Sequence, residues 1–429
     1  MALRQFNIGL RLALAFLVSF RCYAVPDLLD TPQLKLQPVL SPASLTGPPA
    51  ALAYSTKQNI AKQMILIFDA GSSGTRAYLY GWHLEKGKVL PKVFFAGPPE
   101  KPWVLKAPGG LATLVDRLNE VPTYLKPLLV FVKDKLGTQA KIPTYFYATG
   151  GVRKLHDSQE KILLKTVADT LRKETFLDVK EVLELSGQEE GTFTWVAVNA
   201  LAGKFDHSPP AETIGIVELG GASLQIAFVP EKAPEKDRVT LTLGAQTYTL
   251  YSHSYDGVGR EEAFHRLASA QHLNRCFLGE RGAGPGSQLC IQELMDRLAL
   301  RNVKCHSQCA LQDVYQAPLR GEFVGIENFS HVGNEHGEPH PDLKFLEQLG
   351  NKVCALSLSD YRKLYPKAPN PHKACFDISF LRSILEGDGR DRGLGFNSAI
   401  KYRAVAHIKN QEPSWTYGAT LLKILASPH

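Results

Sequence analysis

The sequence predicts an α/β protein built from two related halves. Residues 64–80 and 213–228 share one pattern, in which an apolar run ends in an acid, small residues follow, and a second apolar run begins. Such a pattern is typical of a strand, a tight loop and a second strand. Runs with helical spacing, such as 157–171, alternate with strand-like runs such as 181–186. Two distant copies of one unit indicate two lobes that face each other across a cleft.

The first loop follows Asp69 and consists of small residues up to Thr75. Glycines let backbone N–H groups approach a ligand closely, and a concavity of amides and hydroxyls suits phosphate oxygens. Asp69 beside the loop suits a divalent cation, held directly or through its waters, because Mg²⁺ and Ca²⁺ prefer oxygen ligands. The alternative is a plain β-hairpin with a glycine loop. The candidate phosphate-binding residues here are Ser72, Ser73, Gly74 and Thr75.

The second loop follows Glu218 and contains Gly221, Ala222 and Ser223. Two facing loops, each with an acid, can hold a polyphosphate and its metal between them. The alternative is two unrelated hairpins. A third glycine loop begins at Thr149 and Gly150, at the end of a predicted strand, where ligands commonly gather in α/β folds.

Five segments, in this order, resemble the signature segments of the nucleoside triphosphate diphosphohydrolases, also called apyrases. They are Asp69 to Arg76, Ala148 to Arg153, Ser186 to Gly191 with Trp195 and Asn199, Glu218 to Gln225, and Ser414 to Gly418. The resemblance extends over most of the chain past residue 60. It implies the superfold of actin and the sugar kinases, with two ribonuclease-H-like lobes and the active site between them. It also implies hydrolysis of terminal phosphates of nucleoside tri- and diphosphates with Ca²⁺ or Mg²⁺.

The same resemblance implies a role for individual residues. Glu190 would orient and deprotonate the attacking water, together with Ser223 and Gln225. Asp69 and Glu218 would hold the metal through water, and no phosphoenzyme is needed. The adjacent Glu189 has a simpler explanation, since negative charge is favoured at a helix N-terminus. The phosphates would be held by Ser72, Ser73, Gly74, Thr75, Thr149, Gly150, Gly221, Ala222 and Ser223.

The chain departs from the family pattern at three places. Glu218 stands where the family usually has aspartate, which can replace a bridging water or change the preferred metal. Gly150 replaces the usual alanine, which should loosen that loop. The segment that borders the nucleobase in the family has fewer aromatics here, so Phe329 is the candidate for base stacking, with core packing as its alternative.

The N-terminal residues predict export. Residues 1–24 hold arginines, a short apolar run and a small-residue cleavage site after Ala24, as a secretory signal does. A retained membrane anchor is the alternative. If residues 1–24 are cleaved, we expect the mature protein to have no stable membrane anchor. Residues 25–60 read as a linker or arm, 61–186 with 405–429 as the first lobe, and 187–404 as the second lobe. The expected location is outside the cell, in a periplasm or in an endomembrane lumen.

Charge gives a weaker indication of partners. The chain has 49 basic and 42 acidic residues, and removal of the leader takes three of the arginines. The small remaining positive balance is a weak hint of anionic ligands and is no footprint of nucleic-acid binding. The expected state is a monomer that binds nucleoside tri- and diphosphates.

The six cysteines past the leader lie in the second half of the chain. An even number in an exported protein predicts three disulfides, for which the sequence leaves fifteen pairings open. A metal knuckle at Cys305 and Cys309 lacks a matching second pair. The resemblance implies the pairs Cys276–Cys290, Cys305–Cys309 and Cys354–Cys375.

Two further features have ordinary alternatives. Histidines and glutamates between His331 and His340 lack regular spacing, so a solvated loop is favoured over a metal site. Asn328-Phe329-Ser330 is a glycosylation sequon.

The predicted function is a secreted, metal-dependent apyrase. An exopolyphosphatase-like enzyme of the same superfold is the first alternative, because it would also use paired loops and a glutamate. The second alternative is a catalytically weak, nucleotide-binding member of the superfold.

Overall fold

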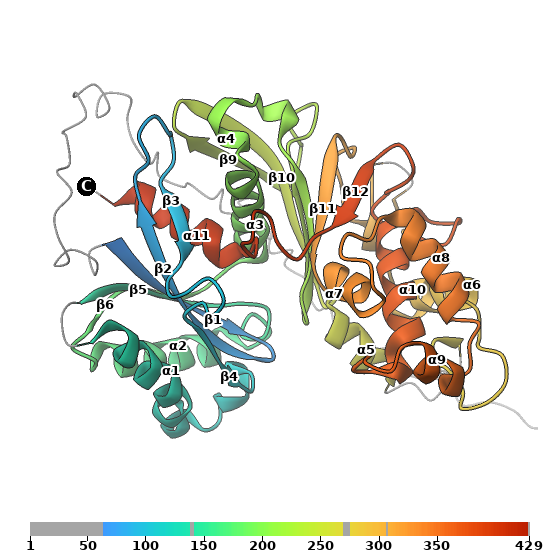
Figure 1. Ribbon diagram of the computed structural model, residues 1–429, viewed down its shortest axis with the longest axis horizontal. Helices are drawn as coiled ribbons and strands as arrows, with labels where there is room; N and C mark the ends of the chain where they lie inside the picture. Colours follow the sequence, from blue (N-terminus) through green and yellow to red (C-terminus); the bar gives the residue numbers. More distant parts are fainter. Residues whose placement is uncertain (1–62, 138–140, 269–274, 306–307, 428–429) are drawn as a thin grey trace, which may run out of the picture. The chain divides into compact units, whose positions relative to one another are not determined.

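The protein is described by a computed structural model over residues 63–137, 141–268, 275–305 and 308–427. Within these ranges two mixed β-sheets carry the two predicted hairpins, and helices lie between and around them (Figure 1). The predicted signal (1–24) and linker (25–60) lie outside the described residues.

The first sheet has the strand order β3-β2-β1-β5-β6, and β4 also pairs with β2. β1 and β2 form the first predicted hairpin, in which Asp69 lies opposite Arg76. β5 runs parallel to β1 on the other side, so that Thr149 follows β5 beside the hairpin loop. The bounds are β1 (Met64–Gly71), β2 (Gly74–His83), β3 (Lys92–Phe95), β4 (Val104–Pro108), β5 (Ile142–Ala148) and β6 (Leu177–Glu184).

The second sheet has the order β12-β11-β7-β8-β10-β9. β7 and β8 form the second hairpin, in which Glu218 lies opposite Gln225. β11 runs parallel to β7, and β10 pairs with β8 so that Ser254 lies opposite Gln225. The bounds are β7 (Gly215–Leu219), β8 (Ser223–Phe228), β9 (Arg238–Leu243), β10 (Gln246–Asp256), β11 (Glu322–Glu327) and β12 (Lys401–Ala404).

The two sheets repeat one arrangement around their hairpins. In both, an antiparallel hairpin with an acid near its tip is flanked by a parallel strand on the side of the acid-bearing strand. The partner of each acid, Arg76 or Gln225, lies on the second strand of the hairpin. This arrangement confirms the predicted α/β class with two ribonuclease-H-like halves.

Two helices connect the halves. α3 packs against β7, β8 and β10 of the second sheet, and α11 packs against α3 and against β1, β2 and β3 of the first sheet. Figure 1 shows α3 and α11 between the sheets, with α1 and α2 on the other side of the first sheet. The central strand β1 is buried over nearly its whole length, which explains why it reads as a continuous apolar run.

α4 packs against α3, and most of the other helices lie on the far side of the second sheet. α6, α8 and α10 pack together there, over a core that includes Phe323, Phe376 and Leu381. The helices are α1 (Val121–Leu136), α2 (Asp157–Arg172), α3 (Gly187–Ala202), α4 (Lys204–His207), α5 (Arg260–Ala268), α6 (Ser287–Arg297), α7 (Asn328–Glu335), α8 (Leu343–Val353), α9 (Leu358–Leu364), α10 (Ala374–Leu385) and α11 (Trp415–Ala426). Short 3-10 helices are η3 (Leu111–Leu114), η4 (Leu118–Glu120), η5 (Pro210–Glu212), η7 (Leu311–Asp313) and η8 (Pro371–Lys373).

The cysteines pair as the family resemblance implies. Disulfides join Cys276 to Cys290, Cys305 to Cys309, and Cys354 to Cys375. Among the helices that the structure describes, none is both long and apolar enough to cross a membrane.

Candidate functional site

The two hairpin loops meet at one pocket of about 310 Å³. Its walls come from both sheets and from the start of α3 and of α11. A cavity of this size lies at the lower end of the range for small-molecule sites. Of the residues proposed from the sequence, its walls include Asp69, Ser72, Ser73, Thr149, Gly150, Glu190, Glu218, Gly221, Ala222 and Ser223.

Glycines let the loops approach each other closely. A Cβ atom on Gly221 would lie 3.1 Å from the Ser72 hydroxyl oxygen, and one on Gly150 would lie 3.2 Å from the Cβ of Ala222. Contacts of this length are tighter than side chains normally make, so an alanine at Gly150 would press on the second loop. The glycine that departs from the family pattern therefore leaves space between the second and the third loop, in addition to any flexibility it adds.

Gly74 and Thr75 support the first loop from beneath. Thr75 is fully buried, and its hydroxyl accepts a hydrogen bond of 2.9 Å from the Tyr124 hydroxyl. A Cβ on Gly74 would lie 2.7 Å from the side chain of Lys106. Neither residue is among the pocket walls, so these two shape the loop from behind, and of the four candidate residues here Ser72 and Ser73 are the ones that line the pocket.

The two hairpin acids both point at the pocket and both are buried. Asp69 has Arg76 at 3.5 Å, and burial raises the pKa of its carboxyl to about 7. Glu218 accepts a hydrogen bond from the Thr194 hydroxyl, and burial together with the nearby Glu190 raises its pKa well above the usual value. Two buried carboxyls whose ionisation is resisted provide oxygen donors for a cation, which would favour their charged forms.

The donor set fits a cation held through water. Within the described ranges, no three acidic, histidine or cysteine side chains are placed to ligate one metal directly. Ca²⁺ and Mg²⁺ commonly keep part of their water shell and take their remaining oxygens from phosphates.

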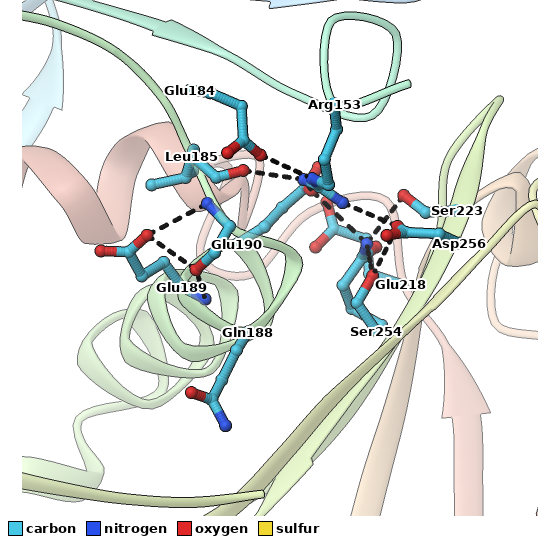
Figure 2. Close-up of polar contacts among 12 residues, drawn as sticks. Arg153, Glu184, Leu185, Gln188, Glu189, Glu190, Glu218, Ser223, Ser254 and Asp256 are labelled. Atoms are coloured by element: carbon cyan, nitrogen blue, oxygen red, sulfur yellow. Dashed lines mark hydrogen bonds and ion pairs between the residues drawn. The ribbon is translucent and has the colours of Figure 1, made fainter. Parts of the chain in front are cut away.

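Glu190 reaches the pocket from the first turn of α3. Ser186 caps this helix by accepting a hydrogen bond from the backbone N–H of Glu189, whose carboxylate accepts one in return from the backbone N–H of Ser186 at 3.0 Å. Glu189 therefore has the capping role that its position indicates. Glu190 is directed to the other side, is buried, and lines the pocket (Figure 2).

Arg153 is the main partner of Glu190. Its guanidinium donates to the Glu190 carboxylate at 2.8 Å and to the Leu185 carbonyl at 2.9 Å (Figure 2). Burial raises the pKa of Glu190, and the charge of Arg153 opposes that rise. Arg153 had no predicted role, although it closes the second signature segment, and that position was the available sequence signal.

Gln225 lies behind the pocket wall. Its amide nitrogen donates to the Ser223 hydroxyl at 2.8 Å and approaches the Glu190 carboxylate at 3.4 Å. The structure thus brings together all three residues of the proposed water-positioning group, although their chemical roles remain a prediction.

Phe329 lies elsewhere. Its side chain is fully buried in the core of the second sheet and contacts the ring of Tyr402, so no face is available to a nucleobase. The structure therefore gives Phe329 the core role that was its alternative. The sequence signal failed because an aromatic in an amphipathic helix packs inward as readily as it binds a ligand.

Polar residues form the pocket wall next to Phe329. Glu327, Asn328 and His331 occupy this side. The Asn328 side-chain amide donates to the Leu219 carbonyl at 2.7 Å, so the sequon asparagine is held by the second hairpin. Because Asn328 lines the pocket, a glycan on it would occupy the pocket.

Comparison with known proteins gives a consistent result. A model of the GDA1/CD39 (nucleoside phosphatase) family matches residues 55–276. The human protein named nucleoside diphosphate phosphatase ENTPD5 is 35% identical over 414 residues, which cover 85% of this chain and 88% of that protein. Probable apyrase 4 of Arabidopsis thaliana is 28% identical over 403 residues, covering 83% of this chain and 78% of the relative.

One solved structure shows the same fold. A crystal structure titled as nucleoside triphosphate hydrolases from Neospora caninum superimposes with a TM-score of 0.50 at 14% identity. The match covers 85% of this chain and 92% of that chain.

Proposed function

This chain belongs to the GDA1/CD39 (nucleoside phosphatase) family, and we propose that it is a metal-dependent apyrase that removes terminal phosphates from nucleoside tri- and diphosphates. The observation that carries the proposal is the single pocket in which both glycine loops, both hairpin acids and Glu190 meet. This combination matches what hydrolysis of a phosphoanhydride requires, namely charge neutralisation, alignment and a placed water.

The loops would bind the phosphate chain from opposite sides. Backbone N–H groups and the hydroxyls of Ser72, Ser73 and Thr149 come from the first sheet, and Gly221 to Ser223 come from the second. Donors fixed before the substrate arrives do not need to be reorganised when charge develops on the phosphate oxygens.

Asp69 and Glu218 would hold Ca²⁺ or Mg²⁺ through water. The bound cation would neutralise phosphate charge. The longer side chain of Glu218 reaches back to Thr194, so its hydrogen-bonded carboxylate oxygen is already oriented.

Glu190 would act as the general base. Its carboxylate would take a proton from a water held by Ser223 and Gln225 as the water oxygen bonds to the terminal phosphorus. The bond from that phosphorus to the bridging oxygen then breaks, and the shortened nucleotide leaves with the electron pair. Arg153 holds one carboxylate oxygen of Glu190 and so leaves the other free to face the water.

A phosphate-release panel tests this function. Purified full-length protein is given ATP, ADP, AMP and inorganic polyphosphate, each with Ca²⁺, with Mg²⁺ and with excess chelator. We expect release from ATP, ADP or both, none from AMP, and loss of release with chelator. Release from polyphosphate alone would replace the proposal with the exopolyphosphatase alternative. Nucleotide binding without any release would indicate a catalytically weak member.

We also propose that the protein is exported. The three disulfides support this, because such bonds persist mainly in oxidising compartments. N-terminal sequencing of protein expressed in its own cells tests the proposal. A mature chain that begins at Val25 is expected, whereas a chain that retains residues 1–24 would favour the membrane anchor.

A further inference from the structure

Glu190 is one of five side chains, from four separate parts of the fold, that form a closed ring of hydrogen bonds. Arg153 bonds Glu190 and Asp256, Asp256 bonds Ser254, Ser254 bonds Gln225, and Gln225 returns to Glu190. Asp256 and Ser254 do not line the pocket, and neither was proposed from the sequence. Figure 2 shows Asp256 and Ser254 on the far side of Arg153 from Glu184.

Asp256 makes two bonds of this ring through one oxygen. It accepts from Arg153 at 2.8 Å and from the Ser254 hydroxyl at 3.2 Å, both at Oδ1. Its side chain is 54% exposed, in contrast to 11% for Glu190. A half-exposed carboxylate at the end of β10 thus joins the two arms of the ring, one through Arg153 and one through Gln225.

The arm through Ser254 determines which way the Gln225 amide faces. A serine hydroxyl has one proton, and Ser254 uses it toward Asp256. Its oxygen therefore accepts from the Gln225 amide nitrogen at 3.0 Å. With the amide nitrogen on this side, its second N–H donates to the Ser223 hydroxyl at 2.8 Å, and the Glu190 carboxylate lies 3.4 Å from the same nitrogen as a weaker, shared acceptor. A flipped amide would bring its oxygen against that carboxylate, which is repulsive.

The direct bond from Arg153 to Asp256 determines how Arg153 is oriented. Glu184 accepts from Nε at 2.8 Å, Asp256 accepts from Nη1 at 2.8 Å, and Glu190 accepts from Nη2. Because the guanidinium is planar and its donors have fixed directions, three carboxylates around it leave one orientation. Without Asp256, Nη1 loses its partner and Arg153 can rotate toward a stronger pairing with Glu190.

We infer that Asp256, acting through Ser254 and Arg153, is a positioning residue that fixes the Gln225 amide and the Arg153 guanidinium beside Glu190 and so directs the Glu190 carboxylate at the attacking water. This inference rests on the proposed phosphohydrolase function. It predicts that loss of Asp256 slows the chemical step while nucleotide binding, which uses the loops, is retained.

Steady-state kinetics of Asp256→Ala and Asp256→Asn test the inference in the full-length protein. We expect kcat to fall about tenfold in Asp256→Ala, consistent with loss of alignment at a reacting centre. The kcat of Asp256→Asn should fall less, because the asparagine amide oxygen can still accept a hydrogen bond from Ser254, although the negative charge beside Arg153 is lost. The KM for ADP or ATP should change by less than about twofold in both variants.

Asp360→Asn is the matched control. Asp360 is 55% exposed, pairs with Lys363 at 2.9 Å and accepts from the Ser357 hydroxyl at 2.8 Å, far from the pocket walls. We expect kcat and KM of this variant to equal those of wild type. Unfolding midpoints of all three variants show whether each one is folded, and the exposure of Asp256 means that folding should be retained.

Two results would overturn the inference. If the wild-type protein is active and Asp256→Ala has the same kcat, the ring does not position the reacting groups. A rise in KM with kcat unchanged would place Asp256 in binding. Wild-type protein that releases no phosphate from any nucleotide would refute the proposed function first, and so the two failures are distinguishable.

Discussion

Gly418 provides the sharpest test of how α3 and α11 position the site. It lies in the first turn of α11, where that helix crosses α3. Helix propensity alone predicts that Gly418→Ala stabilises the protein by about 0.5–1 kcal/mol, because glycine loses more conformational freedom on folding than alanine. The structure predicts the opposite sign.

The magnitude follows from the contact between the two helix backbones. A Cβ on Gly418 would lie 2.7 Å from the carbonyl carbon of Phe193 in α3 and would overlap its oxygen. Neither atom belongs to a flexible side chain, so the helices must separate by roughly 1 Å to reach ordinary van der Waals separation. Overpacking of this kind costs about 1–3 kcal/mol, which exceeds the gain from propensity.

The same displacement of α3 should also lower catalytic activity. Glu190 lies one helical turn before Phe193, so α3 cannot move away from α11 without moving Glu190 relative to the loops. We expect a lower unfolding midpoint and a kcat reduced by about tenfold or more.

The assay compares thermal unfolding and phosphate release of Gly418→Ala with those of Gly350→Ala. Gly350 is also inside a helix, but its Cβ would meet side-chain atoms of Ile378 and Ser287 at 3.3 and 3.4 Å, which can shift slightly. We expect the control to stay within about 1 kcal/mol of wild type. A stabilised, fully active Gly418→Ala would refute the reasoning that this helix crossing holds Glu190 in place.

Three further predictions concern the pocket itself. Burial raises the pKa of Asp69 to about 7, so in the presence of a chelator the free energy of unfolding should fall as the pH rises from about 4 through 7. Asp69→Asn should remove up to about 4 kcal/mol of that fall, and a stability difference between variant and wild type that does not change with pH in urea unfolding would contradict the prediction. Glu190→Gln should lower kcat by about 100-fold or more and retain nucleotide binding by calorimetry, and near-normal turnover would remove Glu190 from the mechanism. Gly259→Ala should raise KM, because its Cβ would overlap the backbone of Gly221 and Ala222 and displace the second loop, whereas an unchanged KM would show that this loop does not bind phosphate.

Local patterns were sufficient for the elements that form within a short stretch of chain. The two hairpins could be predicted because strand periodicity, a terminal acid and a glycine loop all lie within about sixteen residues. Asp69 and its partner Arg76 are seven positions apart, as are Glu218 and Gln225, so each half encodes its own hairpin register. The alternation of helices and strands between them was enough to predict the α/β class.

Contacts between distant segments could not be predicted in the same way. For Phe329 the sequence left base stacking open beside the favoured core role, and its burial and its packing against Tyr402 decide for the core. The close crossing at Gly418 likewise depends on which helix α11 meets.

By itself, the sequence determined the two acid-tipped loops, the family and the set of candidate groups, because each of these is encoded in a short and ordered pattern. Only the tertiary structure decided which of these groups share a pocket and which neighbouring residues orient their side chains. Arg153 and Asp256 are separated by about a hundred residues, yet they bond at 2.8 Å, since the third glycine loop and the end of β10 meet beside α3. Hydrogen bonds depend on distance and direction in space, and residue order constrains neither over so long a separation.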